Sequence, residues 1–176
     1  MRGALPNFPH RCIRRPRLGF TLIEASLTIV IVGVGLLSSF ELFASLTRQN
    51  AASARSTAAM FLANNVQEMM ADLPFNDPSG AGFGTEETGI ANFDDVDDFH
   101  GWKSNPAAPL DSQRQALPDL SRFAQHVTVS HVSVDAPTSN QIGTEAARVT
   151  VRVYYDWTDA SDGQELYKLS WIVMRR

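Results

Sequence analysis

The sequence predicts an α+β fold, in which one long N-terminal helix packs its second half on a C-terminal antiparallel β-meander. Three observations support this prediction. Residues 20–46 form an apolar run whose only charges are Glu24 and Glu41. Residues 47–73 continue without glycine or proline and place apolar side chains at helical spacing. Stretches of the last third alternate apolar and polar residues, which is the pattern of half-buried strands.

Residues 1–19 form a basic leader. Five of the 15 basic side chains lie before Gly19, and all 19 acidic side chains follow it, so the chain from Phe20 onward is formally −9. We interpret the leader as a processing segment that stays outside the fold. Two alternatives are an ordinary secretory signal, cut after the apolar run near Ala44, and a signal anchor that is not processed. An ordinary signal core is shorter than this run and carries no charge.

Residues 20–46 are predicted to be the transmembrane half of the helix. The run has 27 residues, and a helix needs about 20 to cross a bilayer. Because basic flanks stay in the cytoplasm, the N-terminus is expected there, with the chain beyond about Arg48 in the periplasm. A lone carboxylate near the start of such a run, here Glu24, is costly in lipid and is by default a functional-site hypothesis.

Residues 47–73 are predicted to continue the helix as an amphipathic, exposed half. Apolar side chains recur at spacings of three and four, at Ala59, Leu62, Val66, Met69 and Leu73. Pro74 supplies a stop, because the residue before a proline avoids the α region. One helix from about Phe20 to Asp72 is therefore expected, with an apolar stripe that needs a cover.

Residues 74–118 are predicted to be an acidic loop region rich in proline and glycine. A loop of this length without packing is uncommon in a compact domain. Part of it is therefore expected to form a surface layer, anchored by the aromatic residues Phe75, Phe83, Phe93, Phe99 and Trp102.

Residues 119–176 are predicted to form the antiparallel sheet. Alternation predicts strands over residues 148–155 and 165–173, with a turn between them. Upstream, Val127 and Val129 share one parity, whereas Val132 and Val134 share the other. This change predicts a β-bulge or a break near Ser130. The apolar face of the sheet is expected to cover the helix stripe.

The junction Gly19-Phe20-Thr21-Leu22-Ile23-Glu24, behind its basic leader, resembles the signal of type IV prepilins and type II secretion pseudopilins. The resemblance implies a pilin-like fold and a prepilin peptidase that cleaves after Gly19 and N-methylates Phe20. It also implies that Glu24 steers assembly with other pilin or pseudopilin subunits, at an inner-membrane assembly platform and within inner-membrane lipid. The segment 93–101 is similar to one in minor pilins, so a minor pilin-like subunit is expected.

Two classes of function remain after this resemblance. One is a structural subunit of a pilus or pseudopilus. The other is a membrane-anchored adhesin or substrate-binding module that presents residues 74–118 on the same scaffold. An enzyme is not expected, because His100, His126 and His131 are scattered and are interpreted as loop or strand-surface residues. A nucleic-acid partner is not expected either, because the exterior domain is acidic.

No cofactor is expected except one candidate, calcium. Four carboxylates crowd five residues of the loop region, at Asp94, Asp95, Asp97 and Asp98. Calcium takes 6–8 oxygen ligands from such loops, and some pseudopilins use it to fix a loop. The only cysteine, Cys12, lies in the leader, so a disulfide cannot hold this region. The alternative is a solvated acidic surface, and no metal site is assigned.

Overall fold

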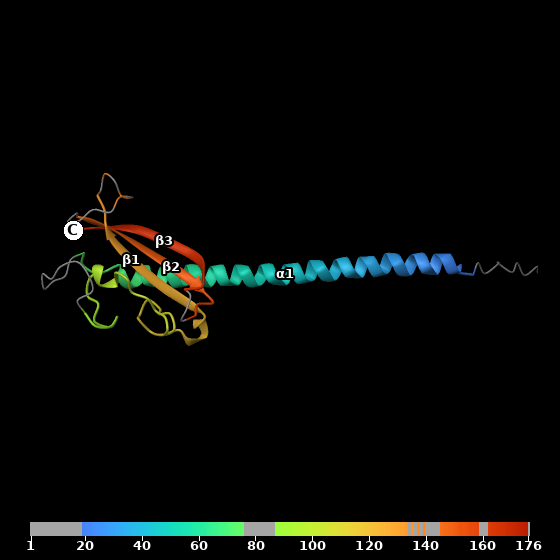
Figure 1. The fold of residues 1–176 in the computed structure, drawn as a ribbon, viewed down its shortest axis with the longest axis horizontal. Helices are drawn as coiled ribbons and strands as arrows, with labels where there is room; N and C mark the ends of the chain where they lie inside the picture. Colours follow the sequence, from blue (N-terminus) through green and yellow to red (C-terminus); the bar gives the residue numbers. More distant parts are fainter. Residues whose placement is uncertain are drawn as a thin grey trace, which may run out of the picture. The chain divides into compact units, whose positions relative to one another are not determined.

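The computed structural model describes residues 19–75, 87–133, 135, 137, 139, 145–158 and 162–175. In chain order the elements are α1 (Leu22–Met70), η1 (Asp97–Phe99), η2 (Pro118–Leu120), β1 (Phe123–His131), β2 (Ala146–Tyr155) and β3 (Gln164–Met174) (Figure 1). The α+β class, with one long apolar helix and a three-stranded antiparallel sheet, is confirmed. The chain divides into two compact units between Thr47 and Arg48, and each is described by itself.

The described part of the first unit consists of the first half of α1 and the three residues before it, Gly19, Phe20 and Thr21. The most apolar 18-residue window of the helix has a mean hydropathy of 2.1, and none of it is buried. Hydroxyl side chains in this half donate to the carbonyl four residues earlier, at Ser26, Thr28, Ser38, Ser39 and Thr47. These bonds satisfy the hydroxyls without water. The helix is therefore long and apolar enough to cross a membrane.

The second unit contains the meander, in the strand order β1-β2-β3. The ladder between β1 and β2 is regular from Phe123, opposite Tyr155, to His131, opposite Ala147. Of the two predicted alternatives near Ser130, the bulge is wrong and the break is correct, because β1 ends at His131. The change of valine parity marks this end. The irregularity lies between β2 and β3, at Val153 and Tyr154.

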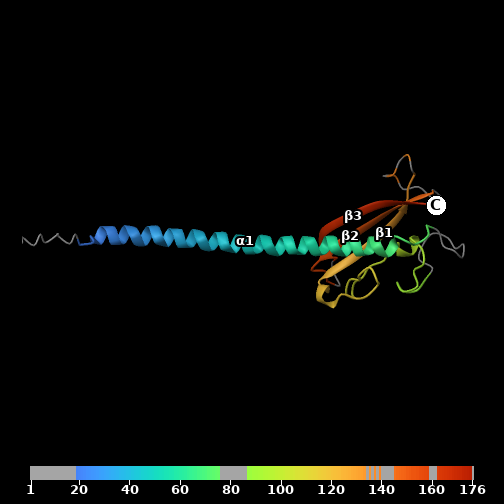
Figure 2. The same ribbon diagram turned by 180° about the vertical axis from the view of Figure 1, so that it is seen from behind.

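The core of the second unit lies between the sheet and the end of α1, which crosses the sheet in the view from behind (Figure 2). Helix residues Ala59, Leu62, Ala63, Val66, Met69 and Met70 are buried with strand valines at 127, 129, 149, 151 and 153. The predicted stripe is thus correct, except that Leu73 is only partly buried. The helix ends two residues before the predicted Asp72, in a turn where the Leu73 N–H donates to the Met70 carbonyl over 3.3 Å.

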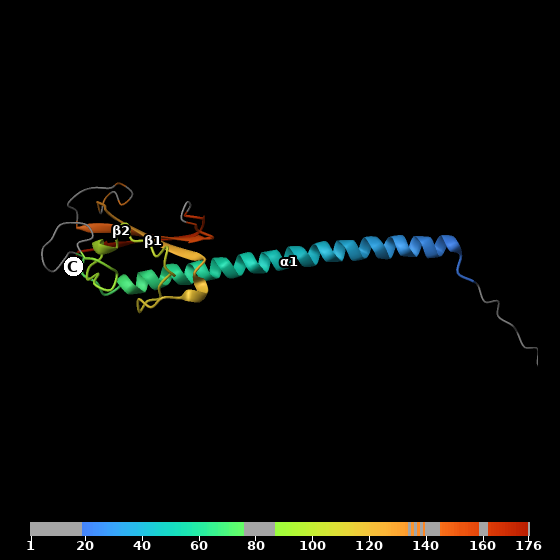
Figure 3. The same cartoon turned by 60° about the horizontal axis from the view of Figure 1, so that its bottom comes forward.

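Part of the loop region packs on this core. Phe93 and Phe99 are buried and meet edge to face, with ring centroids 5.0 Å apart. Figure 3 shows the segment with η1, in yellow-green, beside the end of α1 and the sheet. Trp102 and Phe75 pack more loosely against the same core. Four of the five predicted anchors are therefore correct, and Phe83 lies outside the described residues.

The loop region also covers the outer edge of β1. The Gly101 N–H donates to the Val127 carbonyl over 3.1 Å, and the Val127 N–H donates to the Trp102 carbonyl over 2.9 Å. The Ser104 N–H donates to the Gln125 carbonyl over 2.9 Å. Residues 101–104 thus satisfy backbone groups that a bare strand edge would leave unpaired.

Gln125 connects three parts of the second unit, although it is a polar residue at a fully buried strand position. Its Nε2 donates to the Leu62 carbonyl of α1 over 2.9 Å and to the Leu110 carbonyl over 3.0 Å. Its Oε1 accepts the Leu110 N–H over 2.8 Å. The buried amide is therefore fully hydrogen-bonded, and it joins helix, loop and sheet.

Replacing Gln125 by leucine is expected to destabilise the fold strongly. The variant leaves the N–H and carbonyl of Leu110 without partners, and each orphaned buried group costs about 1–3 kcal/mol. Urea unfolding of the full chain in detergent micelles should show a free energy of unfolding lower by about 2–6 kcal/mol. Gln115→Leu is the matched control, because Gln115 is exposed, and it should change stability by less than about 0.5 kcal/mol. Equal effects of the two variants would refute this role.

Candidate functional site

Thr21 determines where α1 begins. The Glu24 N–H donates to the Thr21 Oγ1 over 3.3 Å, and the Ala25 N–H donates to the Thr21 carbonyl over 3.1 Å. Thr21 is therefore the N-cap of the helix. A threonine followed three residues later by glutamate is the capping-box spacing. The sequence carried this signal, but the resemblance directed attention to Glu24 and not to its cap.

Gly19 and Phe20 precede the cap and lie outside the helix. The Phe20 side chain is 73% exposed. A Cβ atom built on Gly19 would meet no atom within 4 Å. The fold of the described residues therefore leaves the peptide bond between them accessible and does not itself require glycine at position 19. A requirement for glycine here would have to come from another molecule.

Glu24 lies in the first turn of α1, where the positive end of the helix dipole favours a negative charge. Its side chain is exposed. Among the described residues, its carboxylate has no hydrogen-bond or ion-pair partner. A carboxylate at the start of an apolar helix needs a partner, a proton or water once the helix lies in lipid. The described residues therefore leave this charged group without a partner of its own.

A second candidate site lies in the acidic loop region. Carboxylate oxygens of Glu87, Asp94 and Asp98 all lie within 4.8 Å of one another. The Asp98 Oδ2 also accepts the N–H of Asp94 over 3.0 Å. A hydrogen bond to Asp98 is the main cause that raises the pKa of Glu87 to about 7. The structure thus brings Glu87 to Asp94 and Asp98, whereas the sequence pattern grouped Asp94 with Asp95, Asp97 and Asp98.

Asp95 is not one of these three residues, but its N–H also donates to the Asp98 Oδ2, over 3.4 Å, and its side chain is fully buried. Its Oδ1 accepts the N–H groups of Asp97 and Asp98, each over 3.0 Å. Its Oδ2 is buried without a hydrogen-bond partner. Burial is the main cause that raises the pKa of Asp95 to about 8. The hydrogen bond from the Asp98 backbone lowers this pKa, whereas Asp97 raises it further. Near neutral pH this side chain therefore carries a proton in the fold.

The raised pKa of Asp95 predicts that the fold loses stability as the pH rises. Unfolded Asp95 releases its proton near pH 4, whereas folded Asp95 keeps it to about pH 8. Below about pH 4 Asp95 is protonated in both the folded and the unfolded state, so it does not lower the free energy of unfolding. Between these values the free energy of unfolding should fall by up to about 1.4 kcal/mol per pH unit. Urea unfolding across this range measures the slope, which Asp95→Asn should reduce. Asp119→Asn, at an exposed position, should leave the slope unchanged, and equal slopes in all three proteins would contradict the prediction.

The calcium hypothesis stays a prediction, with a changed set of residues. The oxygens of Glu87, Asp94 and Asp98 repel one another, and either a shared proton or a cation can offset that repulsion. Calcium bound only to the folded loop, at 100 times its dissociation constant, would stabilise the fold by about 2.7 kcal/mol. Melting the full chain in excess calcium and in chelator tests this, with Asp98→Asn as the variant that should lose the effect. Equal melting temperatures in both solutions would dispose of the hypothesis.

Arg114 fixes the segment that carries the acidic group, a role that sequence reasoning missed. Its guanidinium donates to the carbonyls of Ile90 and Phe93, each over 2.8 Å. Its Cζ also lies 5.9 Å from the centre of the Phe99 ring. No sequence pattern predicts these bonds, because each joins the Arg114 side chain to a backbone carbonyl more than 20 residues earlier in the chain.

The three histidines among the described residues make separate contacts. The His100 Nδ1 accepts the Val129 N–H over 3.3 Å, and the His131 ring stacks on Phe75 at 5.8 Å. His126 lies on the sheet face turned away from α1, but it is only 8% exposed. The interpretation of His126 as a surface residue is therefore wrong. Loop residues 103–105 cover it, and the sequence gives no sign of that long-range contact.

Comparisons with family models, with curated protein sequences and with solved structures find no match to this chain. A function is therefore inferred from the residues themselves, above all from those at the start of α1.

Proposed function

We propose that this chain is a structural, minor pilin-like subunit of a type IV pilus or a type II secretion pseudopilus. The observation that carries the proposal is the start of α1. There an accessible Gly19–Phe20 bond precedes an exposed apolar helix, and Glu24 supplies a carboxylate in its first turn that has no partner among the described residues. A soluble domain does not combine these features, because an exposed apolar surface of this size needs lipid or neighbouring chains to cover it.

Processing is the first step of this function. A prepilin peptidase cleaves after Gly19 and methylates the new amine of Phe20. Both residues lie before the helical cap, so the peptidase can bind an extended backbone without unwinding α1. The basic leader stays in the cytoplasm, and the second unit lies in the periplasm or on an extracellular pilus.

Assembly is the second step. Cleavage creates a cationic amine on Phe20, only four residues before Glu24. Subunits that insert to the same depth can bring the amine of one beside the carboxylate of the next. Each group then neutralises a charge that is costly in lipid. The exposed apolar surface of residues 20–46 packs against inner-membrane lipid before assembly and against other subunits after it.

Sheared surface fractions test this function against a membrane-anchored adhesin on the same scaffold. A filament subunit should leave the cells with assembled filaments, at a constant ratio to the other subunits. The matched control is a chain in which residues 20–46 are replaced by an unrelated single-pass helix, which should remain in the membrane fraction. Retention of the natural chain in the membrane, in cells that shed filaments, would favour the adhesin and defeat the proposal.

A further inference from the structure

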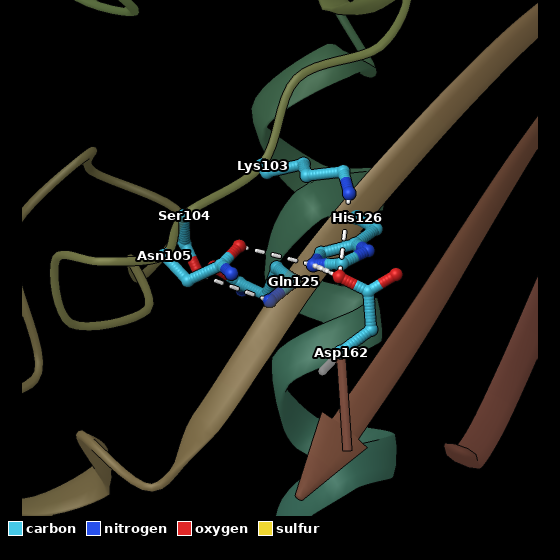
Figure 4. A network of polar contacts seen from close by, with 6 residues as sticks. All are labelled: Lys103, Ser104, Asn105, Gln125, His126 and Asp162. Carbon is cyan, nitrogen blue, oxygen red and sulfur yellow. Dashed lines mark hydrogen bonds and ion pairs between the residues drawn. The ribbon is translucent and has the colours of Figure 1, made fainter. Parts of the chain in front are cut away.

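His126 is the centre of a polar cluster on the face of the sheet turned away from α1 (Figure 4). Its Nε2 lies 3.0 Å from the Asn105 Oδ1 and 3.8 Å from the Asp162 Oδ1. Its ring packs on Tyr154 of β2, with ring centroids 4.7 Å apart. A histidine on β1 is thus in contact with the loop region, with β2 and with the turn before β3.

One carboxylate oxygen joins this histidine to the segment that covers the strand edge. The Lys103 Nζ lies 3.3 Å from the same Asp162 Oδ1 that faces His126 (Figure 4). Lys103 belongs to the segment 101–104, which bonds to the outer edge of β1, and Asn105 directly follows this segment. The polar contacts of His126 are therefore among the side-chain contacts that hold this segment in place, together with the Ser104 Oγ, which accepts the Gln125 N–H over 3.0 Å.

The charges around His126 are unbalanced. Arg152 is its register partner on β2, so the imidazole has a cation on each side, Arg152 and Lys103. Glu165 of β3 lies 3.5 Å from Arg152 and partly neutralises it. Asp162 is the close anion, but Lys103 already uses its oxygen. A positive charge on the imidazole would therefore meet two cations and share one carboxylate.

The neutral imidazole fits this site well. The Asn105 Oδ1 can only accept, so the Nε2 of His126 carries the hydrogen and donates to it. A second proton would go to Nδ1 and would place a charge where water has little access. Burial is the main cause that lowers the pKa of His126, and Lys103 and Arg152 lower it further, whereas Asp162 raises it.

We propose that His126 is a pH-sensitive contact that holds residues 101–105 on the edge of β1 while it is neutral, and that protonation releases them. Release would expose the backbone N–H and carbonyl of Val127 and the carbonyl of Gln125. Unpaired groups of this kind on a strand edge can bind another extended chain. The inference concerns the second unit alone and does not depend on the proposed function.

The direction of the effect follows from the burial of His126 and from its two cationic neighbours, Lys103 and Arg152, which disfavour a charge on the imidazole in the closed state. In the open state His126 titrates near its ordinary value of about 6.5, whereas in the closed state it resists the proton. The closed state is therefore fully favoured above that value and loses its advantage as the pH falls. Because opening takes up one proton, the open fraction should rise by up to about tenfold for each pH unit.

Amide hydrogen exchange of the full chain in detergent micelles tests the proposal between about pH 4 and pH 7, where histidines titrate. After correction for the intrinsic exchange rate, protection of the Gly101 and Ser104 amides should fall by up to about tenfold for each unit by which the pH is lowered. Protection in the middle of β2, at Val151, should not fall as the pH is lowered, because the raised pKa of Asp95 makes the fold as a whole more stable at lower pH. The variant His126→Gln keeps a neutral donor. In this variant the pH-dependent loss of protection at Gly101 and Ser104 should disappear. Protection that is independent of pH in the natural chain would overturn the proposal.

Two charge variants separate this contact from general acid instability. Lys103→Met removes a cation and should raise the titration midpoint of the His126 ring protons in NMR spectra. Asp162→Asn removes the anion and should lower it. Lys168→Met removes a cation two strands away on the same face and should shift the midpoint less than Lys103→Met does. Shifts in the same direction for the first two variants, or no shift in either, would also overturn the proposal.

Discussion

Glu24→Ala is expected to leave the chain processed and in the membrane but absent from filaments. The variant removes the carboxylate that pairs with the Phe20 amine of a neighbouring subunit, and that amine is then left in lipid without a partner. Removing one member of a buried ion pair costs about 3–5 kcal/mol. Incorporation should therefore fall by about a hundredfold or more. Immunoblots of sheared filaments, normalised to the membrane pool, measure this ratio.

The structure indicates suitable controls for this variant. The backbone N–H of residue 24 still bonds to the Thr21 hydroxyl when the side chain is lost, so α1 should begin at the same residue and helicity should not change. Glu41→Ala removes the other carboxylate of the apolar run and should be incorporated normally. Glu24→Gln keeps the shape without the charge and should fail like the alanine variant. Normal incorporation of Glu24→Ala would defeat the pairing hypothesis.

Gly19→Val is expected to leave the chain at full length. The fold has room for a side chain at this position, since nothing lies within 4 Å of a Cβ built there. The valine should therefore be harmless to the chain itself and harmful only in the peptidase site. Overpacking a fitted site costs about 1–3 kcal/mol, so cleavage should slow by about tenfold to a hundredfold. The ratio of full-length to mature chain on a gel gives the result.

Gly33→Val is the matched control for this variant. Gly33 also has free space around its Cβ position, but it lies within α1, well after the cleavage site. Its variant should be cleaved at the natural rate. If Gly19→Val were cleaved as fast as Gly33→Val, the peptidase hypothesis would lose its main support.

Periodic parts of the fold could be predicted from the sequence. The spacing of Leu62, Val66 and Met69 gave the buried face of α1, and alternation gave β2 and β3. In these segments burial follows one local pattern, so a window of a few turns or strand residues contains the information. The roles of Gly19, Phe20 and Glu24 come from the resemblance of the junction to prepilin signals, and they stay predictions.

The parts that local patterns do not determine were missed. β1 begins at Phe123, four residues before the first valine of its pattern, because Gln125 and His126 are polar residues that loop contacts bury. The role of Arg114 likewise depends on partners in other segments, and the raised pKa of Asp95 depends on burial by other segments. Long-range contacts of polar groups decide these positions, and no periodicity records them. The N-cap role of Thr21 could have been predicted from its spacing to Glu24.

The intact mass of the membrane-bound chain, purified from its own cells, tests the central claim most directly. The account predicts a chain that begins at Phe20 and carries one added methyl group on its terminal nitrogen. Fragmentation of the N-terminal peptide should place that methyl on Phe20 itself. A chain that keeps its leader, begins after Ala44 or at any other residue, or carries no methyl would contradict the account.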